Sequence, residues 1–518
     1  MKLNYKRTIL VGFAFFLISA FWQAYDATIP VILTNKFGMS QGWSGVIMAL
    51  DNILAVFMLP LFGALSDKCN SKYGKRTPYI VIGTLLAVVA FFSLSFVDNM
   101  QMKNISDVAQ IDDPAALQVI YDAEKDVSLQ TPDGEAFVLS KVYPNAEDFT
   151  KIKTSDVTTV DGKEVSPYTN YVVPARQAYA AGKTTSNPTP MILFVVLLFV
   201  VLISMAVFRS PAVALMPDVT IKPLRSKANA VINLMGTAGG ILVLVLGIVF
   251  ATSAVKNQLM SYNIYYGVIA GIMVGALVIF LATVREPAWA KQMQDESLRL
   301  NIEDQVEDDG EKRKLSGEEK RSLLLILASI ALWYFGYNAV TSKYSVYAGN
   351  ILNMDYNTTL LIAQGAAIVA YMPAGIVASK IGRKKTIIAG VVMLTTAFGA
   401  ASFMRAGSSV LLMNVLFALA GIGWATINVN SFPMVVEMCS GGDIGKYTGF
   451  YYTASMSAQI ATPMLSGLLM DMDGVGMTVL FPYAAVFAGL ALITMLFVKH
   501  GDAKPEAKKS IEALAVED

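Results

Sequence analysis

Long apolar segments separated by short polar ones dominate the sequence. The hydrocarbon core of a bilayer is about 30 Å thick, so a helix that crosses it needs about 20 apolar residues. By that measure the pattern predicts twelve membrane-spanning helices. They are expected at residues 8–32, 41–65, 78–97, 191–216, 227–252, 263–284, 322–348, 358–379, 386–404, 409–437, 446–470 and 477–498.

Two longer polar stretches interrupt this pattern and divide the chain. Residues 285–321 are highly charged and include an acidic run at 303–310. Such a run is typical of a linker, here between two halves of six helices each. We therefore expect helices one to three in residues 1–97, an extracellular insertion in 98–189, helices four to six in 190–284, a cytoplasmic linker in 285–321, the C-terminal half in 322–499 and a cytoplasmic tail in 500–518.

The insertion at residues 98–189 is polar and carries fourteen acidic and eight basic residues. Asp112-Asp113-Pro114 favours the start of a helix over 115–126. Residues 157–173 alternate around Asp161-Gly162, a pair typical of a hairpin turn. We therefore predict a small folded domain with α and β structure; the alternative is a disordered loop.

The lysines and arginines of the short loops predict the orientation of the helices. Cytoplasmic loops carry an excess of these residues. With the N-terminus inside, fifteen lie on the inner side and only Lys36, Lys256 and Arg405 on the outer side. The pattern predicts a multi-pass protein of the plasma membrane with both termini in the cytoplasm.

Composition supports a membrane protein and argues against several other classes. Hydrophobic residues make up 55% of the chain and charged residues 15%. The sequence shows no P-loop, no Gly-x-Ser-x-Gly turn and no cluster of histidines and cysteines, so we expect no enzyme activity, cofactor, metal site or ATP-driven pumping. Cys69 and Cys439 are expected at cytoplasmic helix ends, where disulfides are rare. The first apolar run is long and no cleavage site follows it, which argues against a cleaved signal peptide.

Two similar basic turns follow the second helix of each half. Residues 63–78 read Gly-Ala-Leu-Ser-Asp-Lys-Cys-Asn-Ser-Lys-Tyr-Gly-Lys-Arg-Thr-Pro, and residues 375–385 read Gly-Ile-Val-Ala-Ser-Lys-Ile-Gly-Arg-Lys-Lys. A proline, Pro60 or Pro373, stands upstream of each. Internal repeats of this kind are typical of secondary transporters. The candidates for a conformational gate in these turns are Asp67, Lys75, Arg76 and Arg383.

Asp67 ends the second helix of the first half. It is expected to face the N-terminus of helix eleven, after Asp443, where the helix dipole favours an anion. Contacts of this kind form in one conformation only and would bias the alternation between two states. The alternative is a solvated loop that only sets the topology.

Four charged residues fall inside apolar helices, where charge is costly and usually functional. Asp26 lies in the outer half of helix one and Asp51 about midway along helix two. Each could carry a coupling proton, or each could be a structural charge paired with Arg209 of helix four or Lys343 of helix seven. Arg209 could also orient a substrate, or lie at the helix end facing the loop.

Polar and aromatic residues recur at helical spacing in several spans. Amides and carboxylates can bond sugar hydroxyls, and aromatic faces can stack on the ring of a carbohydrate, although single residues of this kind also join helices to one another. Carbohydrate is therefore the expected small-molecule substrate. The substrate-binding candidates are Trp22, Tyr25, Arg209, Tyr334, Asn338, Lys343, Trp424, Asn428, Tyr452 and Gln459.

The chain resembles the major facilitator superfamily and, within it, the glycoside–pentoside–hexuronide cation symporters of the branch related to sucrose carriers. The likeness lies in residues 67–80, in 209–218 with 228–230, and in 421–425, and it extends over nearly all the helices outside 98–189. It implies an all-α membrane protein of twelve helices in two pseudo-symmetric halves. It further implies a symporter that imports a small glycoside or disaccharide by alternating access.

Two departures from this pattern affect the coupling ion and the substrate. Melibiose-type members place two aspartates four residues apart in helix two, whereas this chain has only Asp51, and Met58-Leu59 precede Pro60. This argues against a sodium site of that design and favours a proton, with sodium as the alternative. Sucrose carriers have an arginine where this chain has Val213, which argues against sucrose itself.

The sequence thus predicts a proton-coupled importer of a small glycoside, acting as a monomer in the lipid bilayer without nucleic acid. A facilitator or exporter of another small organic solute is the alternative within transport. A membrane sensor or scaffold, whose insertion binds a ligand, is the alternative of another class.

Overall fold

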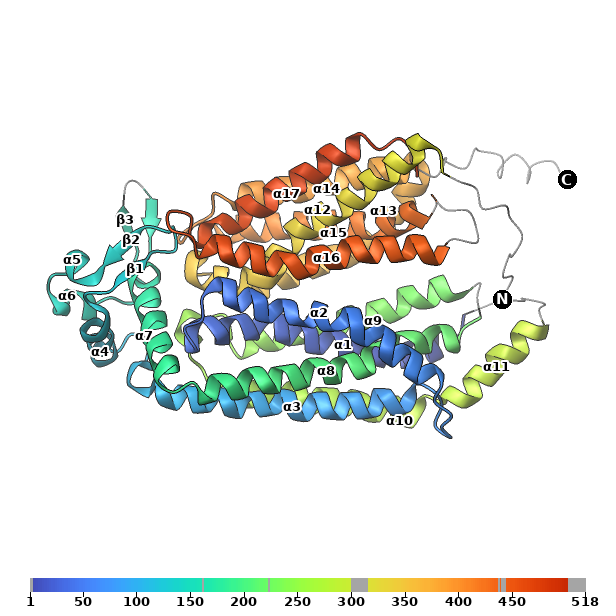
Figure 1. Ribbon diagram of the computed structural model, residues 1–518, viewed down its shortest axis with the longest axis horizontal. Helices are drawn as coiled ribbons and strands as arrows, with labels where there is room; N and C mark the ends of the chain where they lie inside the picture. Colours follow the sequence, from blue (N-terminus) through green and yellow to red (C-terminus); the bar gives the residue numbers. More distant parts are fainter. Residues whose placement is uncertain are drawn as a thin grey trace.

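The structure, a computed structural model, describes residues 3–160, 163–221, 224–299, 315–436, 438 and 444–501. Twelve long helices run side by side along the long axis of the molecule (Figure 1). The first six are α1 (Tyr5–Val31), α2 (Gln41–Asp67), α3 (Thr77–Asn104), α8 (Thr189–Asp218), α9 (Arg225–Val249) and α10 (Asn263–Thr283). The second six are α12 (Gly317–Tyr347), α13 (Tyr356–Ile381), α14 (Arg383–Ala401), α15 (Val410–Val436), α16 (Ile444–Met470) and α17 (Leu480–Leu496).

The helices form two halves, and each half has a hydrophobic core of its own. One cluster of buried apolar residues gathers α1, α2, α3, α8, α9 and α10, and a second gathers α12 to α17. Figure 1 shows the halves as a blue-to-green and a yellow-to-red group. The predicted twelve-helix, two-half architecture is confirmed.

Eleven helices among the described residues are long and apolar enough to cross a membrane. The remaining long helix, α16, is not among them, because residues such as Tyr452, Ser455 and Gln459 lower its hydropathy. A polar helix can cross a bilayer when its polar face is turned towards protein or a water-filled cavity. In this structure α16 packs on α2 and α12, and it supplies Gln459 to a central cavity.

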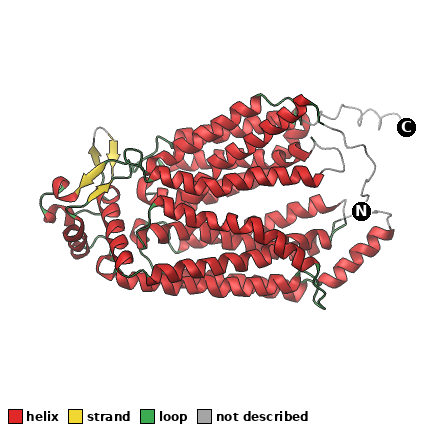
Figure 2. Cartoon of the chain, in the orientation of Figure 1, coloured by secondary structure: helices red, strands yellow, loops and turns green. Residues whose placement is uncertain are grey.

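The insertion between α3 and α8 is a small folded domain with its own core. It contains α4 (Pro114–Glu124), β1 (Ser128–Gln130), β2 (Ala136–Val138), α5 (Leu139–Val142), α6 (Ala146–Thr150), β3 (Thr158–Val160), β4 (Lys163–Val165) and α7 (Val173–Ser186). The strands form two antiparallel hairpins (Figure 2). Buried Ile120, Phe149, Tyr168 and Val172 are part of its core. The predicted α/β character is confirmed.

Local details of the insertion refine the expectations from the sequence. Helix α3 continues to Asn104, beyond the expected boundary at 98, and Asp113 caps α4 through its side chain. The expected hairpin is limited to β3 and β4, and residues 161–162 of its turn lie outside the described residues. Residues Tyr168–Val172 form a π-helical turn instead of a strand, and Tyr168 and Val172 of this turn are buried in the core.

The insertion lies at one end of the bundle, and the chain termini lie at the other (Figure 1). A buried ion pair ties the insertion end of the N-terminal half together: the Nζ of Lys36 lies 2.6 Å from the carboxylate of Asp98, and both side chains are fully buried. At the opposite end, the expected linker begins with α11 (Glu286–Arg299), and residues 300–314 lie outside the described part of the chain.

Candidate functional site

A central cavity of about 200 Å³ lies between the two halves. Helices α1, α2 and α8 of the first half and α12 and α16 of the second half contribute to its wall. The predicted residues that line it are Trp22, Asp26, Asp51, Arg209, Asn338 and Gln459, and they are joined by Met48, Asn52, Thr341, Ser342 and Pro463.

The charged groups of the cavity interact with one another. Asp26 and Asp51 repel each other electrostatically, and Arg209 attracts Asp51. Asp51 also accepts a hydrogen bond of 2.8 Å from the side-chain amide of Asn52. The Arg209 guanidinium lies 5.6 Å from the centre of the Trp22 ring, within the range of a cation–π interaction. Two carboxylates and one arginine therefore share a partly enclosed space between the halves.

Three predicted residues lie on helices of the cavity but are not among the residues that line it. Tyr25 is almost fully buried and packs edge-on against Trp22. Lys343 is fully buried, and its Nζ donates to the backbone carbonyl of Gln41 at 2.6 Å. Tyr452 is 53% exposed and packs against Tyr451.

The remaining three predicted residues form a cluster within the second half. Trp424 stacks on Tyr337, with ring centres 3.6 Å apart, and meets Tyr334 edge-on. Asn428 is hydrogen-bonded to Tyr371. The structure thus places Tyr334, Trp424 and Asn428 among contacts between α12, α13 and α15, and they are not among the residues that line the central cavity.

A set of polar contacts joins the halves at the end that carries the insertion. The carboxylate of Asp471, just after α16, accepts hydrogen bonds from the backbone N–H groups of Gln41 and Gly42 at 2.8 and 2.6 Å. These N–H groups belong to the first two residues of α2, so the Asp471 carboxylate lies at the positive end of the α2 helix dipole. Lys343 of α12 donates to the carbonyl of the same Gln41. We call Gln41, Gly42, Lys343 and Asp471 the inter-half contact.

The backbones of α2 and α16 approach closely next to this contact. A Cβ atom added to Gly45 would lie 1.9 Å from the carbonyl oxygen of Pro463, and one added to Gly467 would lie 2.2 Å from that of Gln41. Helices come this near to each other only where one of them has no side chain. Figure 1 shows α2 and α16 converging towards the insertion and diverging towards the termini.

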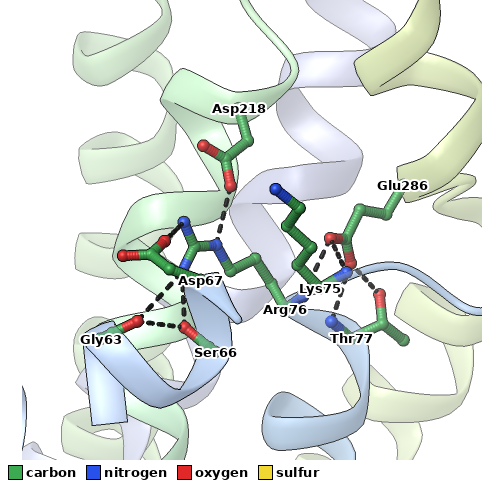
Figure 3. A network of polar contacts seen from close by, with 8 residues as sticks. All are labelled: Gly63, Ser66, Asp67, Lys75, Arg76, Thr77, Asp218 and Glu286. Atoms are coloured by element: carbon green, nitrogen blue, oxygen red, sulfur yellow. Dashed lines mark hydrogen bonds and ion pairs between the residues drawn. The ribbon is translucent and has the colours of Figure 1, made fainter. Parts of the chain in front are cut away.

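The first basic turn forms a polar network at the other end of the bundle (Figure 3). Arg76 is its centre: its guanidinium donates to Asp67 at 2.5 Å, to Asp218 at the end of α8 at 2.7 Å and to Ser66 at 2.5 Å. The two carboxylates raise the pKa of Arg76, against the opposing effect of its burial. In this conformation Asp67 is therefore paired within its own half.

The expected partner of Asp67, the N-terminus of helix eleven after Asp443, lies outside the described residues. Lys75 enters the network through its backbone N–H, which donates to Glu286 at 2.6 Å, and its side chain is exposed. Arg383 begins α14, directly after the turn of the second half. The structure thus brings Asp67 and Arg76 together, and it places Arg383 on the other half.

Glu286 is a central residue of this network that the sequence assigned only to a charged linker. Its carboxylate accepts from the backbone N–H groups of Lys75, Arg76 and Thr77 at 2.6 to 2.9 Å, and from the Thr77 hydroxyl at 2.7 Å. It thus caps the N-terminus of α3. Gly74 has a φ of +109°, and a Cβ there would lie 2.2 Å from the Glu286 carboxyl carbon. The glycine permits both the turn and the approach of the anion.

Twelve helices in two halves around a polar central cavity define a membrane transporter. The family models agree: the model of the Major Facilitator Superfamily matches residues 178–370 and 356–516, and one described as MFS/sugar transport protein matches residues 10–104. The chain belongs to the Major Facilitator Superfamily.

Short segments of the chain are also similar to curated proteins. The sucrose transport protein SUC4 of Arabidopsis thaliana is 40% identical over 65 residues, which are 12% of this chain and 13% of that protein. The proton-associated sugar transporter A of Homo sapiens is 34% identical over 70 residues, which are 14% of this chain and 9% of that protein. The matches thus span only a small part of each relative.

Solved structures support the same fold over the whole chain. The inward-open xylose transporter XylE from E. coli superposes with a TM-score of 0.59 and 16% identity, covering 99% of this chain and 100% of that one. A D-xylose-proton symporter superposes with a TM-score of 0.56 and 14% identity, covering 96% and 99%.

Proposed function

We propose that this protein is a proton-coupled symporter that imports a small glycoside or disaccharide by alternating access. The observation that carries the proposal is the central cavity, which collects two carboxylates, an arginine and three amides from both halves. Amides and carboxylates bond the hydroxyls of a sugar, and Trp22 offers an aromatic surface in the same wall. The curated proteins that match short segments of this chain are named for sucrose transport and for proton-associated sugar transport, which supports a sugar as the class of substrate.

Asp26 and Asp51 are the proposed proton carriers. They lie in one cavity and repel each other, so protonating one of them relieves the repulsion. Arg209 is attracted to Asp51 and is positioned to respond to its charge. Substrate and proton would then be held by the same cavity, which makes the binding of one depend on the other.

The proposed orientation places the insertion outside the cell and both termini in the cytoplasm of a plasma-membrane protein. The inter-half contact closes the insertion end, so this conformation faces inward. In the outward-facing state we propose that the basic turns meet across the cytoplasmic end, with Asp67, Lys75 and Arg76 on one half and Arg383 on the other. No partner subunit is required by this mechanism.

Uptake into proteoliposomes tests the proposal. Radiolabelled mono- and disaccharides are offered with and without an imposed pH or sodium gradient. Asp26→Asn is expected to abolish accumulation against a gradient while leaving exchange of labelled for unlabelled sugar, because exchange needs binding and alternation but no net proton movement. If Asp26→Asn and Asp51→Asn both still concentrate the sugar, these residues do not couple transport to protons.

The alternatives predict different cavities. If the protein exports amphipathic compounds, the wall of the central cavity should be apolar. If it is a sensor, apolar side chains should fill the space between the two halves. Asn338 and Gln459 in the wall of the cavity support neither of them.

A further inference from the structure

A second cavity, also of about 200 Å³, lies where the insertion meets both halves. The insertion supplies Gln130 and Gln177 to its wall, the start of α2 supplies Gln41, and the second half supplies Asn350 and Asp471. We call it the junction pocket. It is separate from the central cavity, because the residues that line the two cavities do not overlap.

The junction pocket is complete only while the second half rests against the insertion. The backbone N–H of Gly474 donates to the carbonyl of Gly134 at 2.7 Å, and the amide of Gln130 donates to Asp473. A Cβ on Gly476 would lie 2.3 Å from the backbone nitrogen of Gly134. Opening the insertion end separates these partners and removes one wall of the pocket.

The hydrogen bonds of the wall leave both acceptors and donors for a ligand. The side-chain oxygen of Asn350 accepts from Gln258 at 3.3 Å, and its amide nitrogen has no partner among the described residues. The amide nitrogen of Gln177 donates to Asn35 at 2.8 Å, and that of Gln130 donates to Asp473. Their side-chain oxygens have no partner among the described residues. Gln41 is 6% exposed, and its side-chain oxygen is buried with no partner in that part of the chain. A buried amide oxygen without a donor is unfavourable by about 1 to 3 kcal/mol, so it favours a ligand that donates.

The charge of the wall favours a neutral ligand. Its acidic residue, Asp471, is satisfied by two backbone N–H groups at the start of α2. Among the described residues, no lysine or arginine lines the pocket. An anion would find no cation in this wall, and a cation would find a carboxylate that is already bonded. Side chains such as Pro132 and Met470 add apolar surface next to the free amide oxygens.

We propose that the junction pocket binds a small neutral polyhydroxylated solute, such as a monosaccharide, and only in the conformation closed on the insertion side. A ligand that binds one of two conformations shifts the population towards that conformation. If the protein is the sugar importer proposed above, external sugar in this pocket holds the carrier inward-facing and slows its return. The pocket is then an inhibitory site distinct from the transport site.

Equilibrium dialysis of the full chain in nanodiscs with radiolabelled glucose, xylose and sucrose tests this inference. For at least one sugar the wild type should show two saturable components. Asn350→Leu and, separately, Gln130→Leu should remove one of them, and Asn338→Leu in the central cavity should remove the other. Gln118→Leu is the matched control: it makes the same change on α4 of the insertion, outside the pocket wall, and should leave both components.

The outcomes separate this inference from the proposed function. A component that survives Asn338→Leu and is lost in Asn350→Leu supports the junction pocket even if no sugar is transported. A single component that Asn338→Leu abolishes overturns the pocket, as does the absence of binding for all three sugars. Survival of both components in the two pocket variants overturns it as well, provided that each variant elutes and melts like the wild type.

Discussion

The two ends of the bundle use charged residues in opposite ways. At the insertion end, Asp471 and Lys343 of the second half bond to the first turn of α2 in the first half. At the other end, Arg76 gathers Asp67 and Asp218, and Glu286 caps α3, all within the first half and the helix that follows it. Contacts of the first kind exist in one conformation, whereas contacts of the second kind can persist through the whole cycle. A charged cluster is thus evidence of a gate only when its members belong to different halves.

The largest effect of a single substitution is expected where α2 and α16 approach closely. Gly45→Ala puts a methyl group 1.9 Å from the Pro463 carbonyl oxygen, a clash that neither backbone can relieve without separating the helices. We expect the inward-facing state to be lost and uptake to fall at least tenfold, which corresponds to about 1.4 kcal/mol. Initial uptake rates in proteoliposomes measure it.

The control for this substitution is Gly271→Ala on α10. A Cβ at Gly271 meets nothing within 4 Å, so this change should leave uptake near the wild-type rate. Normal uptake by Gly45→Ala would show that α2 and α16 do not need to approach this closely during transport.

The Glu286 cap at the other end should govern stability instead of conformation. Glu286→Ala leaves three backbone N–H groups at the start of α3 without their acceptor, those of Arg76 and Thr77 being buried, so we expect a loss of about 2 to 4 kcal/mol in the free energy of unfolding. Thermal denaturation of the purified protein measures this loss.

A distance measured between the two halves tests whether Glu286→Ala leaves the conformation unchanged. Spin labels at the exposed positions Tyr73 and Phe497, one at the end of each half that bears the termini, should report the same separation in Glu286→Ala and in the parent. A changed separation would mean that Glu286 also acts between the halves, and the contrast between the two ends would be wrong.

The sequence could predict where the helices lie along the chain, but it could not predict which face of each helix lines the cavity. Twelve apolar segments of sufficient length determine twelve spans, because nothing else satisfies the backbone in a bilayer. Each residue along a helix turns the side chain by about 100°. Asn338, Thr341 and Ser342 therefore face the central cavity, whereas the adjacent Lys343 reaches Gln41 instead.

Some site residues need the tertiary structure to be recognised. Trp424 was a reasonable candidate for a sugar-stacking residue, but its ring is covered by Tyr337, which comes from another helix. Glu286 lies some 210 residues from the turn that it caps, and one carboxylate in a charged stretch gives no sign of its partner. Gly74 with its positive φ and the three N–H groups after it, which donate to Glu286, form an anion-binding turn. In the sequence, a glycine just before the start of a helix is the signal that could have suggested an acidic partner.

A smaller effect is expected from the charge of Asp471 at the insertion end. Asp471→Asn keeps the size of the side chain but removes the charge from the N-terminus of α2, a change of about 1 kcal/mol and at most about 2. It should shift the population towards the outward-facing state about fivefold, up to about thirtyfold. Spin labels at the exposed positions Trp43 and Phe403, which lie on different halves at the insertion end, should show more of the longer distance. Because the lost charge belongs to an inter-half contact, the same variant should denature at nearly the wild-type temperature, whereas Glu286→Ala should denature at a lower one. A large drop in the denaturation temperature of Asp471→Asn without a change in the distance would show that Asp471 only stabilises the fold.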